Sequence, residues 1–146
     1  WPWKNGKVGM STRALDADGL LAAGDPDWSG APDGTIVGHI HLRVGDLGQA
    51  RGFYAGVLGL DVVNDEYPGG LFLSREGYHH HVGANMWRSR GAGRMDPSRA
   101  GLRWFEMALD EAGYDKAAAA LGLPERGDGA IEAEDPWGIK VRLVRA

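Results

Sequence analysis

The sequence predicts an α+β fold made of two βαβββ modules, and three observations lead to this prediction. A stretch in which apolar and polar residues alternate is followed by a stretch with helical spacing and then by further short strands. The same order returns in the second half of the chain. An interval of 63 residues separates Gly38 from Gly101, which open the first strands, and also Gly59 from Gly122, which close the helices. Two landmarks that share one interval indicate an internal duplication.

The composition restricts the function before any motif is considered. The chain has 146 residues, a formal net charge of -4 and no cysteine. This length suits one domain, and the acidic balance argues against a nucleic-acid partner. Disulfides and thiolate ligands are excluded, so a metal site must use His, Asp or Glu. No apolar run approaches the roughly 20 residues of a membrane span, and no secretory signal pattern is present, so we expect a cytoplasmic protein without a membrane partner.

Residues 1–34 are predicted to form a linker or arm, and residues 35–146 the folded domain. The arm is rich in Gly, Asp and Pro and contains one short helical candidate at residues 15–23. It opens with Trp1-Pro2-Trp3 and lacks an initiator Met, which suggests a fragment of a longer protein. Its apolar side chains predict that the chain associates, either as a homodimer or with a missing N-terminal half.

The first module, residues 35–90, is expected to begin with a strand at residues 37–44. Apolar Ile40, Leu42 and Val44 alternate with polar residues, so one face covers a helix and the other faces away from it. The polar face carries His39, His41 and Arg43.

The remainder of this module is predicted as a helix and three strands. Asp46 is a candidate N-cap with Gln49 three residues later, and apolar residues recur at helical spacing until Gly59. Turn residues then separate the expected strands, which are residues 61–66, 71–74 and 78–87.

The second module, residues 100–146, repeats this order. A strand at residues 101–109 leads to a helix that begins at Asp110, and closing strands are expected at residues 130–134 and 139–144. By the alternation argument, Phe105, Met107 and Leu109 face the helix. The opposite face then carries Trp104, Glu106 and Ala108.

Several of these motifs resemble the vicinal oxygen chelate superfamily, which includes glyoxalases, bleomycin-resistance proteins and extradiol dioxygenases. The resemblance covers about residues 35–146 and implies a glyoxalase-like fold in which two modules form a cup-shaped sheet. Residues 77–83 are similar to the histidine-bearing strand of the extradiol dioxygenases, and the chain is most similar to the C-terminal half of catechol-2,3-dioxygenase-like proteins. The motifs that carry the resemblance are the string 38–47, Phe53-Tyr54, Val57-Leu58-Gly59 and the turn Asp135-Pro136-Trp137-Gly138.

The resemblance implies a metal held by residues that project into the cup, but the ligand positions depart from the family pattern. His39 occupies the first ligand position, whereas Trp104 stands where a second histidine is expected and Arg142 where a glutamate is expected. Non-haem iron uses two neutral imidazoles and one carboxylate, and a fixed cation repels a divalent metal. The resemblance therefore implies a divalent metal, iron before others, while the replaced ligands leave open a chain without one.

Because of these departures, we predict a substitute metal site made of His39, His80 and Glu106. His80 resembles the family's catalytic acid/base histidine. His41, Trp104 and Arg142 are the predicted substrate contacts. A structural interpretation competes with this one: half-buried, hydrogen-bonded histidines, with Trp104 and Arg142 stacked as the floor of the cup.

The function implied by the resemblance is that of part of an extradiol, catechol-type dioxygenase-like enzyme, an oxidoreductase whose metal site is degenerate in this half. Its partner would be a small aromatic or other organic ligand. One alternative is a glyoxalase-type, metal-dependent lyase or isomerase. The other is a non-catalytic drug-binding module, like the bleomycin-resistance proteins, with aromatic walls formed by Trp87, Trp104 and Trp137.

Overall fold

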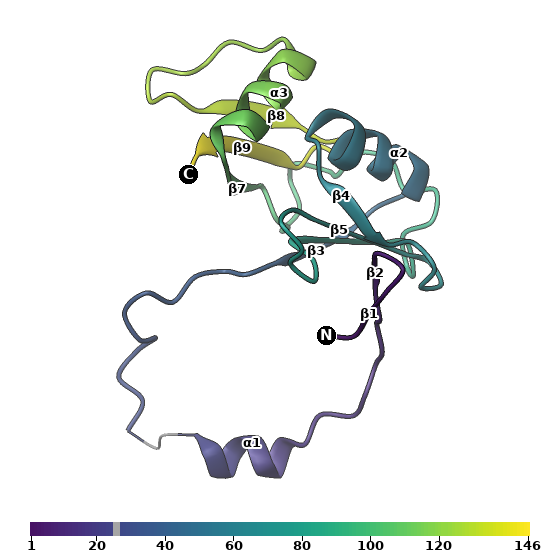
Figure 1. The fold of residues 1–146 in the computed structure, drawn as a ribbon, viewed down its shortest axis with the longest axis vertical. Coiled ribbons are helices and arrows are strands. Elements are labelled where there is room, and N and C mark those ends of the chain that lie inside the picture. The colour runs from purple at the N-terminus through teal and green to yellow at the C-terminus, as the bar shows by residue number, and fades with distance from the viewer. Residues whose placement is uncertain (25–26) are drawn as a thin grey trace.

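A computed structural model describes residues 1–24 and 27–146, and its body contains two mixed β-sheets (Figure 1). In each sheet the first strand pairs in parallel with the last, and the other pairs are antiparallel. The first sheet has the order β3-β6-β5-β4, with β3 (Ile40–Arg43), β4 (Asp61–Asn64), β5 (Gly70–Ser74) and β6 (Val82–Asn85). The second has the order β7-β9-β8, with β7 (Trp104–Leu109), β8 (Ile131–Glu134) and β9 (Lys140–Arg145). The predicted α+β class is confirmed.

Two helical segments of the body begin and end at the predicted caps. The Asp46 side chain accepts a hydrogen bond from the Gln49 N–H at 2.8 Å and begins α2 (Leu47–Arg51), which continues as the π-helix η1 (Gly52–Val57). The Asp110 side chain likewise caps α3 (Glu111–Leu121). Gly59 and Gly122 follow these helices with φ of +75° and +62°, a conformation that glycine adopts without a Cβ clash.

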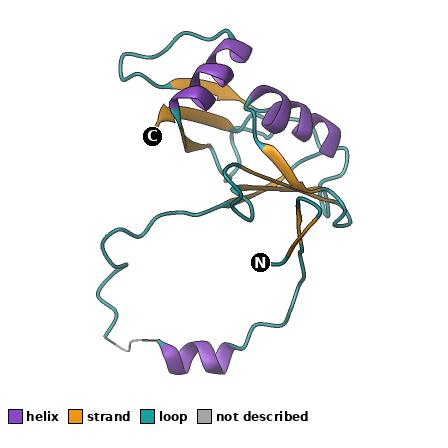
Figure 2. Cartoon of the chain, in the orientation of Figure 1, coloured by secondary structure: helices purple, strands orange, loops and turns teal. Residues whose placement is uncertain are grey.

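One hydrophobic core joins the two modules. Figure 2 shows that the helices α2 and α3 lie beside each other over the strands of both sheets. The core contains Leu42 and Tyr54 from the first module and Tyr114 and Val141 from the second, all fully buried or nearly so. The Tyr54 hydroxyl donates a hydrogen bond to the buried Asp135 carboxylate at 2.8 Å, which ties η1 to the turn before β9.

The predicted strand at residues 78–87 is shorter than expected: β6 spans Val82–Asn85, and residues 78–81 form an irregular segment after the turn at Glu76-Gly77. Glu76 and Gly77 both have positive φ, and the Tyr78 N–H bonds back to the Arg75 carbonyl. The Arg75 N–H is directed to His81 Nδ1 at 3.3 Å, a side-chain acceptor that competes with strand pairing. The strand begins at Val82, so the three consecutive histidines lie in the segment that leads into β6.

The second module departs from the predicted βαβββ order and is β7-α3-β8-β9. Residues 122–130 are all described and contain no strand. This segment holds Pro124, which has no N–H to donate, and three glycines. Backbone hydrogen bonds within the segment take the place of strand pairing. The Arg126 N–H donates to the Ala130 carbonyl at 2.7 Å, and the Gly129 N–H donates to the Arg126 carbonyl at 2.9 Å.

The predicted arm, residues 1–34, is partly packed on the body and partly extended away from it (Figure 1). A hairpin of β1 (Trp3–Lys4) and β2 (Lys7–Val8) brings Val8 into a small apolar cluster with Val63 and Phe72. The short helix α1 (Ala17–Ala23) lies far from the body and buries no residue. Residues 25–26 of this arm lie outside the described residues. No helix in the described part of the chain has the length and apolar character needed to cross a membrane.

Candidate functional site

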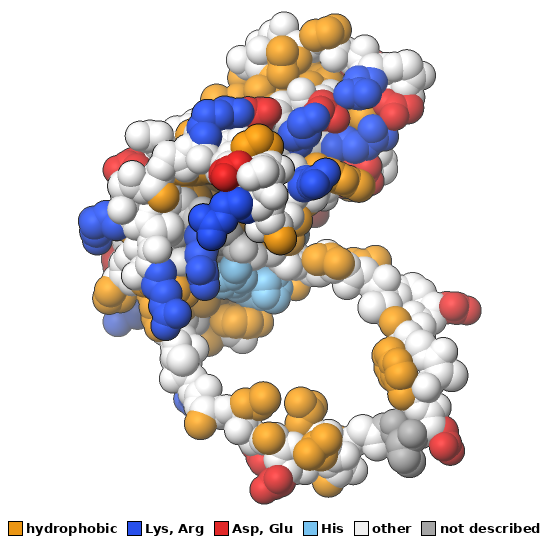
Figure 3. All heavy atoms as spheres, turned by 180° about the vertical axis from the view of Figure 1, so that it is seen from behind, with side chains coloured by type: hydrophobic (Ala, Val, Ile, Leu, Met, Phe, Trp, Pro, Cys, Tyr) orange, Lys and Arg blue, Asp and Glu red, His pale blue; other side chains and the backbone are white. Residues whose placement is uncertain are grey.

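Three histidines converge beside the first sheet. His41 is in β3, His39 precedes that strand, and His80 precedes β6. Because β3 and β6 pair in parallel, residues near the start of both strands meet at the same place. One ring nitrogen of each histidine lies within 4.8 Å of the others. Figure 3 shows the histidine side chains gathered on the face of the body that looks toward the arm. We call His39, His41 and His80 the histidine cluster.

The histidine cluster is tightly packed at its inner end. His41 Nε2 and His80 Nε2 are 3.0 Å apart, and the rings of His39 and His80 have centroids 4.5 Å apart. Phe72 contacts the His80 ring at its edge. Gly83 provides the room for His41, since a Cβ at this position would lie 2.8 Å from His41 Cε1. Any side chain at this position of β6 would clash with the His41 ring, so this close approach requires glycine.

Burial favours the neutral form of two imidazoles of the cluster, His80 and His41. Burial lowers the pKa of His80 to about 4, and the nearby His39, His79 and His41 rings lower it further. Burial, followed by the His39 ring, also lowers the pKa of His41. Neutral imidazole is the form that offers a lone pair to a metal. The histidine cluster could therefore hold a divalent metal ion at neutral pH.

The two histidines on either side of His80 have other roles. His79 stacks on Trp1, with ring centroids 4.1 Å apart and planes at 6°. His81 Nδ1 lies 3.1 Å from the Ser74 hydroxyl and accepts the Arg75 N–H. Of the three consecutive histidines, only His80 joins the cluster.

Glu106, the predicted carboxylate ligand, is not brought into the histidine cluster. It lies on β7 and accepts a hydrogen bond from Arg142 Nε at 2.8 Å, across the β7–β9 pair. Arg142 Nη1 also donates to Asp128 at 2.9 Å. Trp104 is 57% exposed on the same face of β7. The predicted metal set is thus divided between the sheets, with His39 and His80 together and Glu106 held by Arg142.

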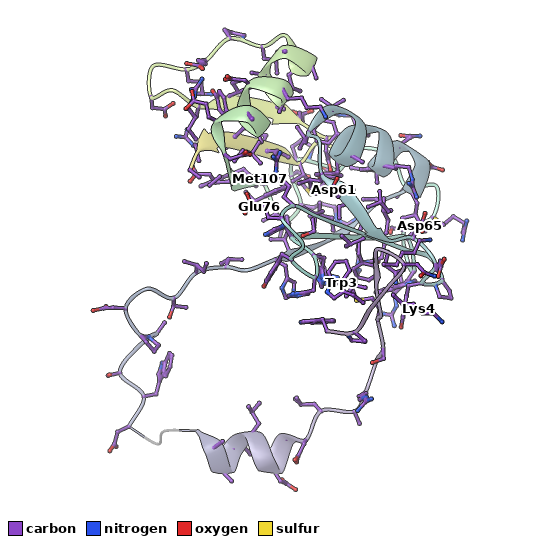
Figure 4. The ribbon with its side chains drawn as sticks, in the orientation of Figure 1. Trp3, Lys4, Asp61, Asp65, Glu76 and Met107 are labelled. Atoms are coloured by element: carbon purple, nitrogen blue, oxygen red, sulfur yellow. The ribbon has the colours of Figure 1, made fainter. Side chains whose placement is uncertain are left out.

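A cavity of about 710 Å³ lies between the edge strands β3 and β7. Its walls are mainly apolar, and the polar groups at its sides include His39, Glu76 and Glu106. Figure 4 labels Met107 and Glu76, which both line it and lie near each other in that view. His39 is the one residue that belongs both to the histidine cluster and to this lining.

The proposed aromatic walls are wrong for this cavity. Among the described residues that line it, none is a tryptophan. Trp137 is buried and donates its Nε1–H to the Ala92 carbonyl, whereas Trp87 donates to the Pro68 carbonyl. Each indole is thereby directed to a different part of the body.

The sequence predicts His41 as a substrate contact and does not indicate Gly83, whereas the structure places His41 in the histidine cluster with Gly83 beneath its ring. His41 was assigned to the substrate side because strand parity gives a face but not a partner strand. The sequence carries one usable signal: histidines two apart on a strand share a face, and a third histidine on a parallel neighbour can reach them.

Comparisons with known proteins agree with this fold. Residues 36–143 match the model of the Glyoxalase/Bleomycin resistance protein/Dioxygenase superfamily. The chain is 44% identical over 109 residues to the catechol-2,3-dioxygenase of Bacillus subtilis (strain 168). That match covers 73% of this chain but only 38% of the relative, so the chain spans less than two fifths of the relative's length.

Two solved structures show the same fold at low sequence identity. A glyoxalase/dioxygenase from Nostoc punctiforme superposes with a TM-score of 0.55 at 16% identity, covering 91% of this chain and 97% of that one. A lactoylglutathione lyase from Agrobacterium tumefaciens superposes with a TM-score of 0.50 at 20% identity, covering 77% and 94%. Because the family model matches residues 36–143 and the relative is 44% identical over 73% of the chain, the chain belongs to the Glyoxalase/Bleomycin resistance protein/Dioxygenase superfamily.

Proposed function

We propose that this chain is the ligand-binding domain of a catechol-2,3-dioxygenase-like enzyme, and that a small aromatic molecule binds in the cavity between β3 and β7. The observation that carries this proposal is the double position of His39, in the cavity wall and in the histidine cluster. The 44% identity to a catechol-2,3-dioxygenase supports the ligand class. In this proposal residues 35–146 form the domain, and its two sheets are the halves of one cup, with β3 and β7 at the centre.

The cavity residues suit a flat, mostly apolar ligand. Ile40, Leu102 and Phe105 offer apolar surface that would cover a ring and exclude water from it. Depending on its tautomer, a His39 nitrogen can either donate a hydrogen bond to a ring hydroxyl or accept one from it. Arg75, beside the cavity, is held in place by Asp110 at 2.7 Å and brings a fixed cation to the same wall.

The iron implied by the family does not fit the residues at its usual positions. Glu106 is paired with Arg142, and the indole of Trp104 has no lone pair to offer a metal. We therefore derive no ring-cleaving step for this chain by itself. A complete enzyme would need ligands from elsewhere, or the chain binds its ligand without transforming it. The Glu106–Arg142 pair favours this second, non-catalytic role.

A pair of leucines provides a matched test. Leu102 lines the cavity, Leu123 does not, and both are 42% exposed. Catechol is titrated into the full chain, and binding is followed by isothermal calorimetry. Leu102→Trp should fill part of the cavity and weaken binding at least about tenfold, a change of roughly 1.4 kcal/mol. Leu123→Trp should leave the affinity within about twofold. Equal affinities for the two variants, or no catechol binding by the parent chain, would contradict the proposal.

A further inference from the structure

We infer that His39, His41 and His80 form a metal site of three imidazoles, contained entirely in the first module, which binds nitrogen-preferring divalent ions such as Zn²⁺. The inference deepens the proposed function, because the site adjoins the proposed ligand cavity through His39. It concerns metal binding alone, which can be measured without any organic ligand.

The spacing of the ring nitrogens is the first argument. Two nitrogens that each lie about 2.1 Å from one ion are separated by roughly 3.0 to 3.4 Å, for angles between octahedral and tetrahedral. His41 Nε2 and His80 Nε2 are 3.0 Å apart. The third nitrogen lies within 4.8 Å of both, and His39 is exposed, so its ring has room to turn inward.

The burial of His80 is the second observation that bears on the site. The His80 side chain is 4% exposed, and its Nδ1 has no hydrogen-bond partner among the described residues. A buried imidazole with a purely structural role is normally satisfied at its polar atoms. The other nitrogen of His80, Nε2, faces His41 Nε2 at 3.0 Å, so these two nitrogens share either one proton or one bound ion.

The residues packed around the rings also favour a metal site. Gly83 lies directly under the His41 ring, where a Cβ would be 2.8 Å from Cε1, and Phe72 packs against the edge of His80. Apolar packing of this kind fixes the direction of a ligand ring before a metal arrives. His80 is thus the buried ligand of the set, while His39 and His41 are both exposed.

The ligand types define the class of metal. Three imidazoles and no carboxylate suit zinc, copper, nickel and iron, whereas Mg²⁺ and Ca²⁺ prefer oxygen ligands. Three protein ligands also leave a position for water or a bound molecule, as in catalytic zinc sites. Since no residue of β7 or β9 takes part, the site does not need the positions occupied by Trp104 and Arg142.

The test is titration of Zn²⁺ into the full chain after treatment with a chelator, with Mg²⁺ as the comparison ion. We expect one Zn²⁺ per chain and no measurable binding of Mg²⁺ at the same concentrations. His39→Gln, at an exposed position, should weaken Zn²⁺ binding by more than the roughly 10- to 100-fold typical of residues outside the ligand shell. Thermal melting of each variant without metal establishes that it is folded.

Two control variants separate this site from its alternatives. His79→Gln, next to His80 but outside the cluster, should change the Zn²⁺ affinity less than about threefold. Glu106→Gln should do the same, and a loss as large as that of His39→Gln would restore the imidazole–carboxylate site and overturn the inference. So would an equal loss in His79→Gln, or the absence of Zn²⁺ binding. Zn²⁺ binding without catechol binding would defeat only the proposed function, and the reverse result only this inference.

Discussion

Arg142 Nε donates to Glu106 Oε2 at 2.8 Å, directly across the parallel pair of β7 and β9. The arginine occupies the position where the family resemblance expects a glutamate ligand, and it pairs with the one acidic residue on the same face of β7. Asp128 contacts the same guanidinium from the preceding loop. Glu106 and Arg142 are therefore each engaged by a charged partner on this face of the second module.

The first prediction follows from this pair. After anaerobic loading with Fe²⁺, the chain should form no detectable yellow ring-opened product from catechol, because two of the three usual ligands are absent. The measurement is absorbance during the first minutes after oxygen is admitted. The Bacillus subtilis catechol-2,3-dioxygenase serves as the positive control in the same cell. Robust product from this chain would mean that other residues hold the iron.

The second prediction concerns the bond between the modules. Tyr54→Phe removes the hydroxyl that donates to Asp135 and leaves a buried carboxylate oxygen without this donor, which should lower the free energy of unfolding by about 1 to 3 kcal/mol. Urea denaturation measures the change. Tyr67→Phe is the control, since the Tyr67 hydroxyl contacts only exposed Thr12, and it should cost less than about 0.5 kcal/mol. Similar losses of unfolding free energy in both variants would show that the buried hydrogen bond stabilises the fold no more than the exposed one.

The third prediction is a loss of stability in mild acid. The ordinary pKa of histidine is 6.5, and that of His80 in the folded chain is about 4. Above pH 6.5 the ring is neutral in both states and contributes nothing. Between pH 6.5 and pH 4 the unfolded chain takes up a proton that the folded chain refuses, so the free energy of unfolding falls, by at most about 1.4 kcal/mol per pH unit.

The urea midpoint of the metal-free chain, measured at pH 7 and pH 5, tests this expectation. Lowered pKa values at His41 and His81 act in the same direction. His80→Gln should reduce the difference between the two midpoints. An unchanged difference in that variant would assign the acid sensitivity to other groups.

The fourth prediction concerns the glycine under the histidine cluster. Gly83→Ala should displace the His41 ring, because the new Cβ would come within 2.8 Å of it, and should weaken Zn²⁺ binding about tenfold or more. Gly93→Ala is the matched control, since a Cβ there meets nothing within 4 Å. Calorimetric titration of both variants gives the answer. Unaltered zinc affinity in Gly83→Ala would show that the His41 ring can move without cost.

The fifth prediction is a homodimer. The part of the arm that extends from the body exposes large apolar side chains, and such surface favours self-association. These residues are Leu15, Leu20, Leu21 and Trp28. Light scattering at micromolar concentration should give twice the chain mass. The triple variant Leu20→Ser, Leu21→Ser, Trp28→Ser should shift the chain to monomer, and Leu123→Ser on the body should not. A parent chain that is monomeric would end this proposal.

Local sequence rules predicted the helix ends and the strand faces well. Asp46 and Asp110 are followed by orphan N–H groups that only a short acceptor can reach, so the caps were readable from sequence. Leu42 is buried and His41 is exposed, as alternation requires. These features depend on neighbours within a few residues.

The histidine cluster could be predicted only in part, because it depends on contacts distant in sequence. His80 reaches His41 because β3 pairs with β6, and no local pattern specifies which strands pair. In the segment that leads into β6, the His81 side chain accepts a hydrogen bond from the Arg75 N–H, which residue propensities do not anticipate. The pairing of Glu106 with Arg142 likewise needs the register of β7 against β9.

The bond from Tyr54 to Asp135 also bears on how the molecule comes apart. Although the chain looks like two repeats, the helix of one half and the closing turn of the other complete a single buried hydrogen bond inside one shared core. Neither half therefore has a finished interior of its own. Cleavage in the connection at residues 88–99 would yield two pieces that are insoluble or unstructured when separate and that regain order by recombining. In folding terms the two halves form one cooperative unit.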